Sequence, residues 1–409
     1  MKNVKLIYIS PDNKTNKFFN MTQLDDNLFE VNYGTVGNKG MFIKYPMKDW
    51  NKILNGRKSK GFSDVTNNAK IVRIGNPDFN NLKPKVKDLL LLLNKYAKEA
   101  FKLNYTVEIT DVSEQLVIEA QEIIDKINKL LVINVPINQV TVLLLSLYKK
   151  IPRKIINIAD SMIKPINNQS DLDKAFDKLT IEQGLLDVVK GQLTNAKDVN
   201  DPIDNSKVLS YLDNLGLDID EVSSTEETML KTMMNTSVSK YITAYKVINF
   251  RTQKNFDTEL SKAKDKTTKL LFHGSRSENW VSIIKNGLQL HPNAVTTGKL
   301  FDNGIYFAND ADKSLGYISG GRWNRSSGDN DNWLAVYEVH TGNDATQKDI
   351  DKLSNNDRYF RPNLAKWIPD NGFDSYFADH NIEKRYNLQR DEFIIYNENK
   401  CTIKYLIHI

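Results

Sequence analysis

The sequence predicts an α+β chain of several domains, divided into a β-rich segment at 1–78, an all-α segment at 79–198 and a mixed segment at 199–409. Three observations support this division. β-Branched and aromatic runs open the chain, apolar residues at helical spacing fill its middle, and short strand-like runs between Gly- and Asn-rich loops follow. The 409 residues suffice for two to four domains, and 40% hydrophobic with 26% charged residues is an ordinary globular composition.

The first segment is predicted to form a small β domain. VKLIYIS, KFFNMTQL and LFEVNYGTVG are rich in strand-forming residues, and the turn signals PDN and NKG lie between or after them. KDWNKILNGRKSKGF predicts a short helix that ends in a basic turn. GNPDFNNLKP, with its Gly, Pro and Asn residues, predicts a linker to the next segment.

The second segment predicts several packed helices. In DVSEQLVIEAQEIIDKINKLL, Asp111 and Glu114 form a capping-box-like start. Apolar residues then recur at helical spacing, at Leu116, Ala120, Ile123, Ile127 and Leu130. KVKDLLLLLNKYAKEAFKL, INQVTVLLLSLYKK and DLDKAFDKLTIEQGLLDVVKGQL predict further helices, and the polar run NAKDVNDPIDNS closes the segment. Nothing in this segment indicates catalysis.

Charge and cysteine content limit the class of protein. The net charge is +5, and residues 1–78 carry 13 Lys and Arg against 7 Asp and Glu, which favours an anionic partner for this segment or a solvated surface. A single cysteine, Cys401, excludes an intramolecular disulfide. Because no apolar run has the length of a membrane span and the N-terminus lacks a signal-peptide core, we expect a soluble intracellular protein without a membrane partner. It would be nuclear in a eukaryote and in the cytoplasm or nucleoid of a prokaryote.

The third segment carries the residues that indicate chemistry. LFHGSRSENW places His273, Gly274 and Ser275 at a strand end. GKLFDNGIYFANDADKSLGY holds a second group, and RDEFIIYN begins a strand with Glu392. Each residue taken singly is more often structural, but together and in this order they indicate a site. The other histidines lack a Cys or His partner at ligand spacing, so no metal site is predicted.

These motifs resemble the catalytic domain of the poly(ADP-ribose) polymerases. The resemblance implies a catalytic triad of His273, Tyr306 and Glu392 on separate strands. It extends upstream, where the helical segment resembles the regulatory helical bundle of the family and residues 1–65 resemble a WGR domain. The implied fold is a β-rich WGR-like domain, an all-α bundle and an α+β ADP-ribosyltransferase domain with two antiparallel-rich sheets.

The resemblance implies that NAD+ is a substrate and that no cofactor is permanently bound. The Gly274 backbone and the Ser275 hydroxyl would hold the nicotinamide carboxamide. Glu392 would bond the nicotinamide ribose and stabilise the cation that develops as the glycosidic bond breaks. The remaining implied NAD-binding residues are Tyr306 and Tyr317 around the nicotinamide ring, His273 with Asn279 and Ser314 at the adenosine-side ribose, and Lys313, which elongating members also have.

The implied function is a poly(ADP-ribose) polymerase of the DNA damage response, activated by DNA ends or nicks. Acceptors would be protein side chains, including those of the enzyme itself. Two departures weaken parts of this reading: Arg390 stands where elongating members often have an aromatic residue, and Tyr33-Gly34-Thr35 replaces Trp-Gly-Arg. The expected DNA contacts are Tyr33, Lys39, Lys44, Arg57, Lys58 and Lys60.

Three alternatives remain at this point. A mono-ADP-ribosyltransferase or an NAD glycohydrolase would use the same site with a single acceptor or water. The acceptor could also be a nucleic-acid end. A non-catalytic nucleic-acid-binding scaffold is disfavoured, because His273, Tyr306 and Glu392 are all present.

Overall fold

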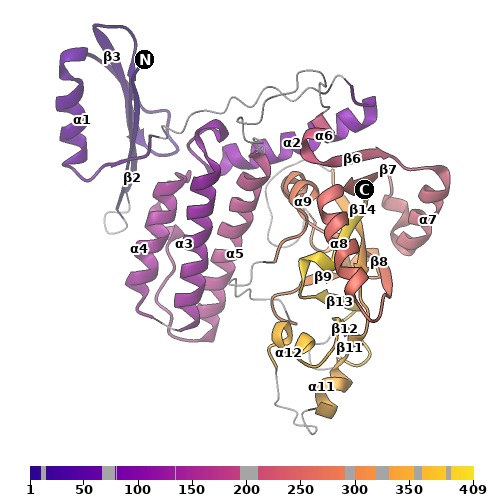
Figure 1. Ribbon diagram of the computed structural model, residues 1–409. Coiled ribbons are helices and arrows are strands. Elements are labelled where there is room, and N and C mark those ends of the chain that lie inside the picture. The colour runs from indigo at the N-terminus through magenta and orange to yellow at the C-terminus, as the bar shows by residue number, and fades with distance from the viewer. Residues whose placement is uncertain are drawn as a thin grey trace. The chain divides into compact units, whose positions relative to one another are not determined.

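A computed structural model describes residues 1–10, 15–66, 79, 81–133, 135–193, 211–290, 300–318, 331–353, 362–383 and 388–409 (Figure 1). The described chain mixes helices with sheets, so the predicted mixed class is confirmed. It forms two compact units, of which the first comprises Met1–Arg73 with Glu99–Leu193 and the second Ile74–Lys98 with Thr194–Ile409. Domain boundaries are predicted after residues 78 and 198, and both residues lie outside the described ranges. No described helix is long and apolar enough to cross a membrane.

The first unit opens with an antiparallel five-stranded sheet of order β4-β3-β2-β1-β5. Alternating apolar side chains of this sheet bury one face against Trp50 of α1, as the two-residue period of a strand requires. The elements are β1 (Asn3–Ser10), β2 (Thr15–Gln23), β3 (Leu28–Thr35), β4 (Met41–Pro46), α1 (Trp50–Lys58) and β5 (Ser63–Asp64). Ile7 and Ile9 point the other way and join the core of the helices of the same unit.

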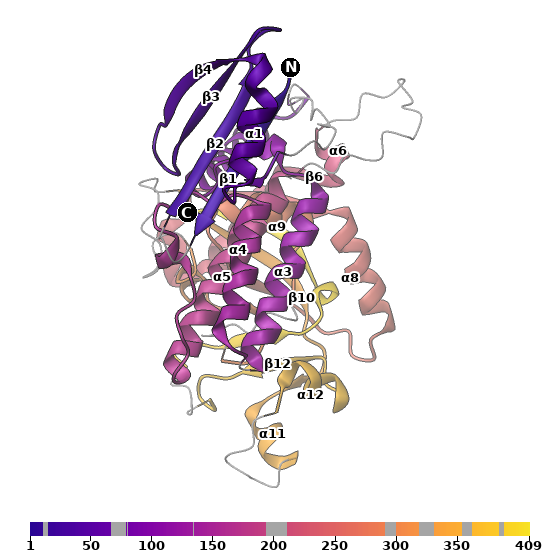
Figure 2. The ribbon, with the colours of Figure 1, turned by 90° about the vertical axis from the view of Figure 1, so that its left-hand side faces the viewer.

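Three long helices, α3 (Glu114–Val132), α4 (Ile137–Lys150) and α5 (Gln169–Gln192), lie side by side in the first unit (Figures 1 and 2). The start of α3 differs from the predicted one. Ser113 is its N-cap and accepts a hydrogen bond from the Leu116 amide, whereas Asp111 belongs to a preceding 3-10 turn that Glu108 caps. The prediction of an Asp111 start was wrong, because a serine next to the helix competes for the same amides.

The core of the three helices contains a buried charged cluster. Glu182 of α5 has a side chain only 1% exposed and pairs with Arg153 and with Lys178, at 2.9 Å from the latter. It also accepts a hydrogen bond of 3.0 Å from the Tyr148 hydroxyl. Burial raises the pKa of Glu182, but the nearby cations outweigh it and leave the pKa below its ordinary value.

The second unit contains two sheets. The larger is antiparallel with order β6-β7-β14-β10-β8, and the smaller has order β11-β12-β13-β9 with one parallel pair, β11 with β12. The strands are β6 (Leu217–Glu221), β7 (Thr243–Asn249), β8 (Thr268–Gly274), β9 (Ile305–Phe307), β10 (Trp333–His340), β11 (Asp344–Ala345), β12 (Ser375–Ala378), β13 (Glu392–Ile395) and β14 (Cys401–His408).

Helices cover and connect these sheets. They are α6 (Tyr211–Leu215), α7 (Ser224–Met234), α8 (Phe250–Lys262), α9 (Trp280–Asn286), α10 (Ala311–Leu315), α11 (Gln347–Leu353) and α12 (Leu364–Asp370). The helix α2 (Pro84–Asn104) belongs to both units, since the division falls between Lys98 and Glu99. Its apolar residues Val86, Leu89, Leu90 and Leu93 pack into the core of the larger sheet, so this part of the helical segment is built into the second unit.

Candidate active site

The two sheets of the second unit meet at β8 and β9. Phe272 of β8 and Ala308, just after β9, exchange two backbone hydrogen bonds of 2.8 and 3.0 Å. On its other side β9 pairs with β13, in the register that places Tyr306 opposite Ile394. As a result, the three predicted triad residues come from neighbouring strands: His273 from β8, Tyr306 from β9 and Glu392 from the start of β13.

The His273 ring is fixed by its surroundings. Its Nδ1 lies 3.0 Å from the backbone oxygen of Tyr306. A carbonyl oxygen only accepts, so Nδ1 carries a proton and donates to it. Phe307 and Tyr337 flank the ring, with centroids at 5.7 and 6.0 Å. This environment suits a ring that positions a partner by hydrogen bonding.

The hydroxyl of Tyr306 makes two hydrogen bonds that hold the side chain in place. The hydroxyl donates to the Asp302 carbonyl at 2.8 Å and accepts from the Phe301 amide at 2.9 Å. Burial raises the pKa of Tyr306 far above its ordinary value, so the hydroxyl stays protonated. Tyr317, which follows α10, has an exposed side chain.

Gly274 lies directly against Ser314 of α10. A Cβ atom at Gly274 would stand only 2.0 Å from the Ser314 backbone oxygen, so no other residue fits without moving the backbone. Ser314 itself is buried. Ser275 has a different neighbour, since Asn279 donates to its hydroxyl at 3.1 Å. The side-chain oxygen of Asn279 is buried and has no hydrogen-bond partner among the described residues.

Glu392 is a buried carboxylate with a cation beside it. Its side chain is only 5% exposed, and its Oε1 lies 2.8 Å from Nζ of Lys313 on α10. A buried charge is costly unless it is paired, so Lys313 explains how a glutamate occupies this strand start. The pair joins the second and third motifs found in the sequence.

Charged residues around this pair were missed by sequence reasoning. Asp310 and Asp312 both pair with Arg390, which the sequence singled out only as a departure from the family. His380 bonds Asp391 at 2.7 Å, and with Asp379 these residues offer atoms close enough to hold a metal ion. The repeated opposite charges of NDADK and RDE were the only sequence signal.

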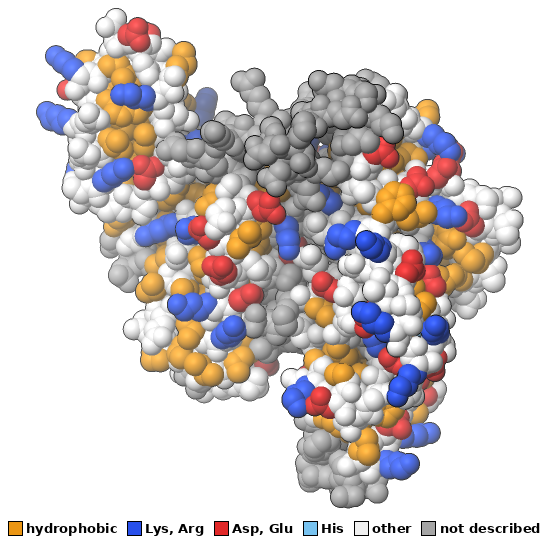
Figure 3. Space-filling view, in the orientation of Figure 1, with side chains coloured by type: hydrophobic (Ala, Val, Ile, Leu, Met, Phe, Trp, Pro, Cys, Tyr) orange, Lys and Arg blue, Asp and Glu red, His pale blue; other side chains and the backbone are white. Residues whose placement is uncertain are grey.

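The predicted DNA contacts fall into separate groups. Lys44 of β4 pairs across from Glu30, on the sheet face opposite α1, while Lys39 lies between β3 and β4. The remaining basic residues, Arg57, Lys58 and Lys60, are at the end of α1. Figure 3 shows the Lys and Arg side chains of the N-terminal segment as separate groups on the face in view.

Some of the basic residues at the end of α1 already have partners in the first unit. Lys58 pairs with Asp64 at 2.8 Å. Arg57 stacks over the Phe19 ring at 4.2 Å, and Tyr33 packs on the same ring with centroids 6.0 Å apart. Tyr33 and Arg57 thus both pack on Phe19, although they lie on different elements.

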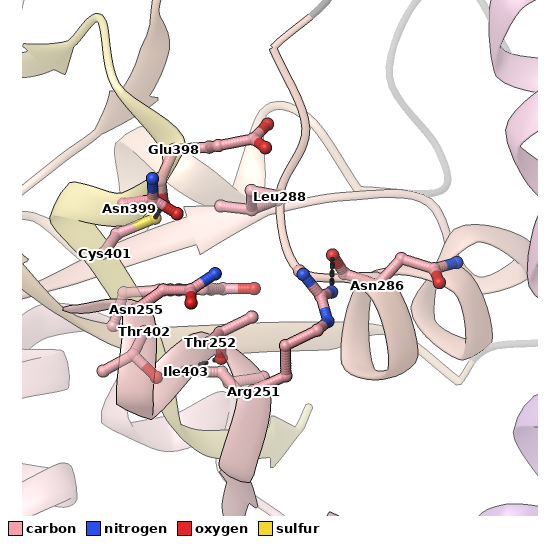
Figure 4. Close-up of a pocket in the computed structure, with 12 residues that line it drawn as sticks. Arg251, Thr252, Asn255, Asn286, Leu288, Glu398, Asn399, Cys401, Thr402 and Ile403 are labelled. Carbon is pink, nitrogen blue, oxygen red and sulfur yellow. Dashed lines mark hydrogen bonds between the residues drawn. The ribbon is translucent and has the colours of Figure 1, made fainter. Parts of the chain in front are cut away.

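A small pocket elsewhere in the second unit contains none of the predicted site residues (Figure 4). Its lining comes from α8, the end of α9, Tyr337 of β10, the turn before β14 and the start of β14. Arg251 points across it and donates to the Asn286 carbonyl at 2.6 Å. Cys401 lies in its wall and is fully buried, and burial raises the pKa of its thiol, so the thiol stays protonated.

Comparison with known proteins identifies the family. Residues 220–409 match the sequence profile of the poly(ADP-ribose) polymerase catalytic domain. A poly(ADP-ribose) polymerase-like protein of Invertebrate iridescent virus 6 is 33% identical over 174 residues, which cover 42% of this chain and 87% of the viral protein.

Cellular relatives match over smaller shares of their own length. Poly(ADP-ribose) polymerase 2 of Zea mays is 29% identical over 215 residues, 46% of this chain and 31% of that protein. The poly(ADP-ribose) polymerase of Drosophila melanogaster is 27% identical over 282 residues, 64% of this chain and 27% of that protein. The chain belongs to the poly(ADP-ribose) polymerase family and is an NAD-dependent ADP-ribosyltransferase, as the sequence predicted.

Proposed function

We propose that His273, Tyr306 and Glu392 form the catalytic centre that cleaves NAD+ and transfers ADP-ribose. The observation that carries this proposal is the buried Lys313–Glu392 pair, because it places one charged carboxylate where three neighbouring strands meet. A fixed negative charge in a water-poor site stabilises a cation that develops in the transition state. Loss of nicotinamide gives the ribose this cationic character.

In this reaction the bond between the ribose and the nicotinamide nitrogen breaks, and its electron pair leaves with nicotinamide. The acceptor oxygen then bonds to the same ribose carbon, and its proton passes to a base. Glu392 is the group suited to that role, since a carboxylate can hold a ribose hydroxyl and accept the proton of the incoming nucleophile. Tyr306 is unsuited to it, because its hydroxyl stays protonated.

The described residues fit NAD+ as a substrate. We place the Gly274 backbone and the Ser275 hydroxyl at the nicotinamide carboxamide. The close approach of Gly274 to Ser314 supports this placement, because it holds the end of β8 against α10. The unpartnered, buried oxygen of Asn279 needs a donor, and a ribose hydroxyl would supply it. We therefore place Asn279 with Ser314 and His273 at the adenosine-side ribose, and the rings of Tyr306 and Tyr317 on the nicotinamide.

We further propose that DNA ends or nicks bind the N-terminal segment and stimulate transfer to protein acceptors. The surplus of basic residues in this segment supports the proposal, as does the packing of both Tyr33 and Arg57 on the Phe19 ring. The proposal includes the WGR-like, helical and transferase domains at 1–78, 79–198 and 199–409, and a role in DNA repair. Nicks and ends would act through phosphate contacts that displace counterions.

A second candidate is mono-transfer, in which a single ADP-ribose is added to each acceptor. Arg390 favours it, because a charged residue held by two carboxylates stands where elongating members often have an aromatic residue. Lys313 and Glu392 favour elongation instead, since elongating members share them.

A turnover assay separates these outcomes. The full chain is mixed with labelled NAD+, with and without a nicked duplex, and the products are separated on a denaturing gel. A ladder that DNA stimulates supports polymerase activity and DNA dependence together. A single labelled band that DNA leaves unchanged supports mono-transfer and removes the DNA proposal, and free ADP-ribose alone indicates a glycohydrolase.

A further inference from the structure

Three successive residues, the last of which begins β13, each contact the segment that carries α10. These contacts connect β13 to α10 at further points besides the Lys313–Glu392 pair. The partners are Arg390 with Asp310 and Asp312, Asp391 with Asn309, and Glu392 with Lys313.

The two aspartates that hold Arg390 also organise α10. Asp310 is the N-cap of this helix and accepts a hydrogen bond of 2.8 Å from the Asp312 amide. Asp312 accepts hydrogen bonds from Ser237 and, at 3.2 Å, from Thr236, both on the 3-10 helix Asn235–Lys240. Arg390 therefore contacts the first turn of α10 at two points, one of which is anchored on a third element.

The helix α10 needs such anchors. It comprises only Ala311–Leu315, and a helix this short is not stable by its own hydrogen bonds. Its place is set by its caps, its buried side chains and its ion pairs. The Lys313 side chain is long and flexible, so the position of its ammonium group depends on where the helix lies.

We propose that Arg390 is a positioning residue for the reaction. Its pairs with Asp310 and Asp312 hold α10 against the start of β13, so that Lys313 stays beside Glu392. This inference rests on the proposed role of Glu392. Ion pairs as exposed as those of Arg390, whose side chain is 41% exposed, contribute little to stability. A small displacement of a catalytic group, in contrast, costs about 100-fold in rate.

The main alternative is that Arg390 binds the acceptor. The two roles predict different results for the reaction with water. A positioning residue affects every reaction that begins with cleavage of NAD+, including its hydrolysis to free ADP-ribose. A residue that only binds the acceptor affects transfer and leaves hydrolysis at the parent rate.

The first experiment measures nicotinamide release by the full chain without added acceptor. We expect Arg390→Ala to lower kcat about tenfold or more while KM for NAD+ stays within about twofold, and Arg390→Lys to recover most of the rate. The unfolding midpoint should barely move. Lys231→Met is the matched control, because its pair with Glu227 has similar exposure, 45% and 40%, and lies in the same unit.

The second experiment combines Arg390→Ala with Lys313→Met. If Arg390 acts through Lys313, its replacement should cost much less in the Lys313→Met background. Equal fractional losses in both backgrounds would overturn the inference, as would parental nicotinamide release by Arg390→Ala.

Glu392→Gln is measured in parallel. It distinguishes a wrong inference about Arg390 from a wrong proposal for the function of the site. An inactive Glu392→Gln with a fully active Arg390→Ala removes only the inference about Arg390. A fully active Glu392→Gln removes both the role of Glu392 and the inference that depends on it.

Discussion

Lys313 and Glu392 form a close ion pair between α10 and β13, with Nζ and Oε1 2.8 Å apart. The glutamate is almost fully buried, while about a fifth of the lysine side chain is exposed, which leaves the pair open on one side only. Because each partner compensates the other, replacement of either one affects both the chemistry and the stability of this region.

Replacement of Glu392 by glutamine should abolish most turnover and spare substrate binding. Glutamine keeps the shape of the side chain but neither stabilises a cation nor accepts a proton, so we expect kcat to fall by about 10²–10⁴. Binding of a nicotinamide analogue, measured by calorimetry, should remain. Glu338→Gln is the control, because it alters a carboxylate of β10 that lies 3.1 Å from Lys404 of β14. Turnover at the parent rate would exclude a chemical role for Glu392.

Replacement of Lys313 by methionine should lower stability as well as rate. It leaves the buried Glu392 without its cation, and breaking such a pair costs about 3 kcal/mol, or less where solvent reaches one partner. Urea unfolding of the full chain measures this loss. Lys313→Arg keeps the charge and should retain most of the stability. Equal stability of Lys313→Met and the parent would show that solvent already compensates Glu392.

Gly274→Ala tests the close approach of β8 to α10. The added Cβ would stand 2.0 Å from the Ser314 backbone oxygen, so β8 and α10 must separate. We expect KM for NAD+ to rise and turnover to fall at least about tenfold, because the site elements move apart. Gly56→Ala is the control, since nothing lies within 4 Å of a Cβ there and alanine favours α1 by up to about 1 kcal/mol. An unchanged KM and turnover in Gly274→Ala would contradict the described backbone contact.

The buried Glu182 cluster should make the first unit sensitive to acid. Burial opposes ionisation of Glu182, but Arg153 and Lys178 hold its pKa below the ordinary 4.5. A pKa lowered by folding stabilises the fold above about pH 4.5, and this contribution is lost as the pH falls through the folded value. Glu182→Gln should therefore lower the free energy of unfolding near pH 7 by about 3–5 kcal/mol and flatten its decline in acid. Parallel pH profiles of the two proteins would exclude this cluster as the cause.

DNA binding should depend on only one of the two groups of basic residues. Lys39 and Lys44 belong to β3–β4, and Lys58 and Lys60 to the end of α1, so we expect one duplex to engage one group. A double Lys→Glu change in that group should weaken binding of a nicked duplex and reduce the salt slope by about 0.9 for each phosphate that is no longer neutralised. The other group serves as the control. Equal small effects of both changes, or binding that salt does not affect, would remove the DNA proposal.

Local sequence patterns were sufficient to locate many of the strands and helices. Strand-forming runs such as KLLFHGS and WLAVYEVH correspond to β8 and β10, and the apolar spacing around Ala120 and Ile127 corresponds to the buried face of α3. Backbone periodicity and side-chain shape act over a few residues, so these features are visible in sequence. Helix ends were less predictable. Asp111 and Ser113 lie only two residues apart, and either side chain could cap the start of α3.

The sequence by itself determined the mixed fold, the motifs around His273, Tyr306 and Glu392, and through them the family. Only the tertiary structure decided that Lys313 lies beside Glu392, that Arg390 is held by Asp310 and Asp312, and that the first part of α2 packs into the core of the second unit. These contacts join segments far apart in the chain. They depend on which strands pair and which apolar faces meet, and this is settled by the packing of the whole core rather than by any local pattern.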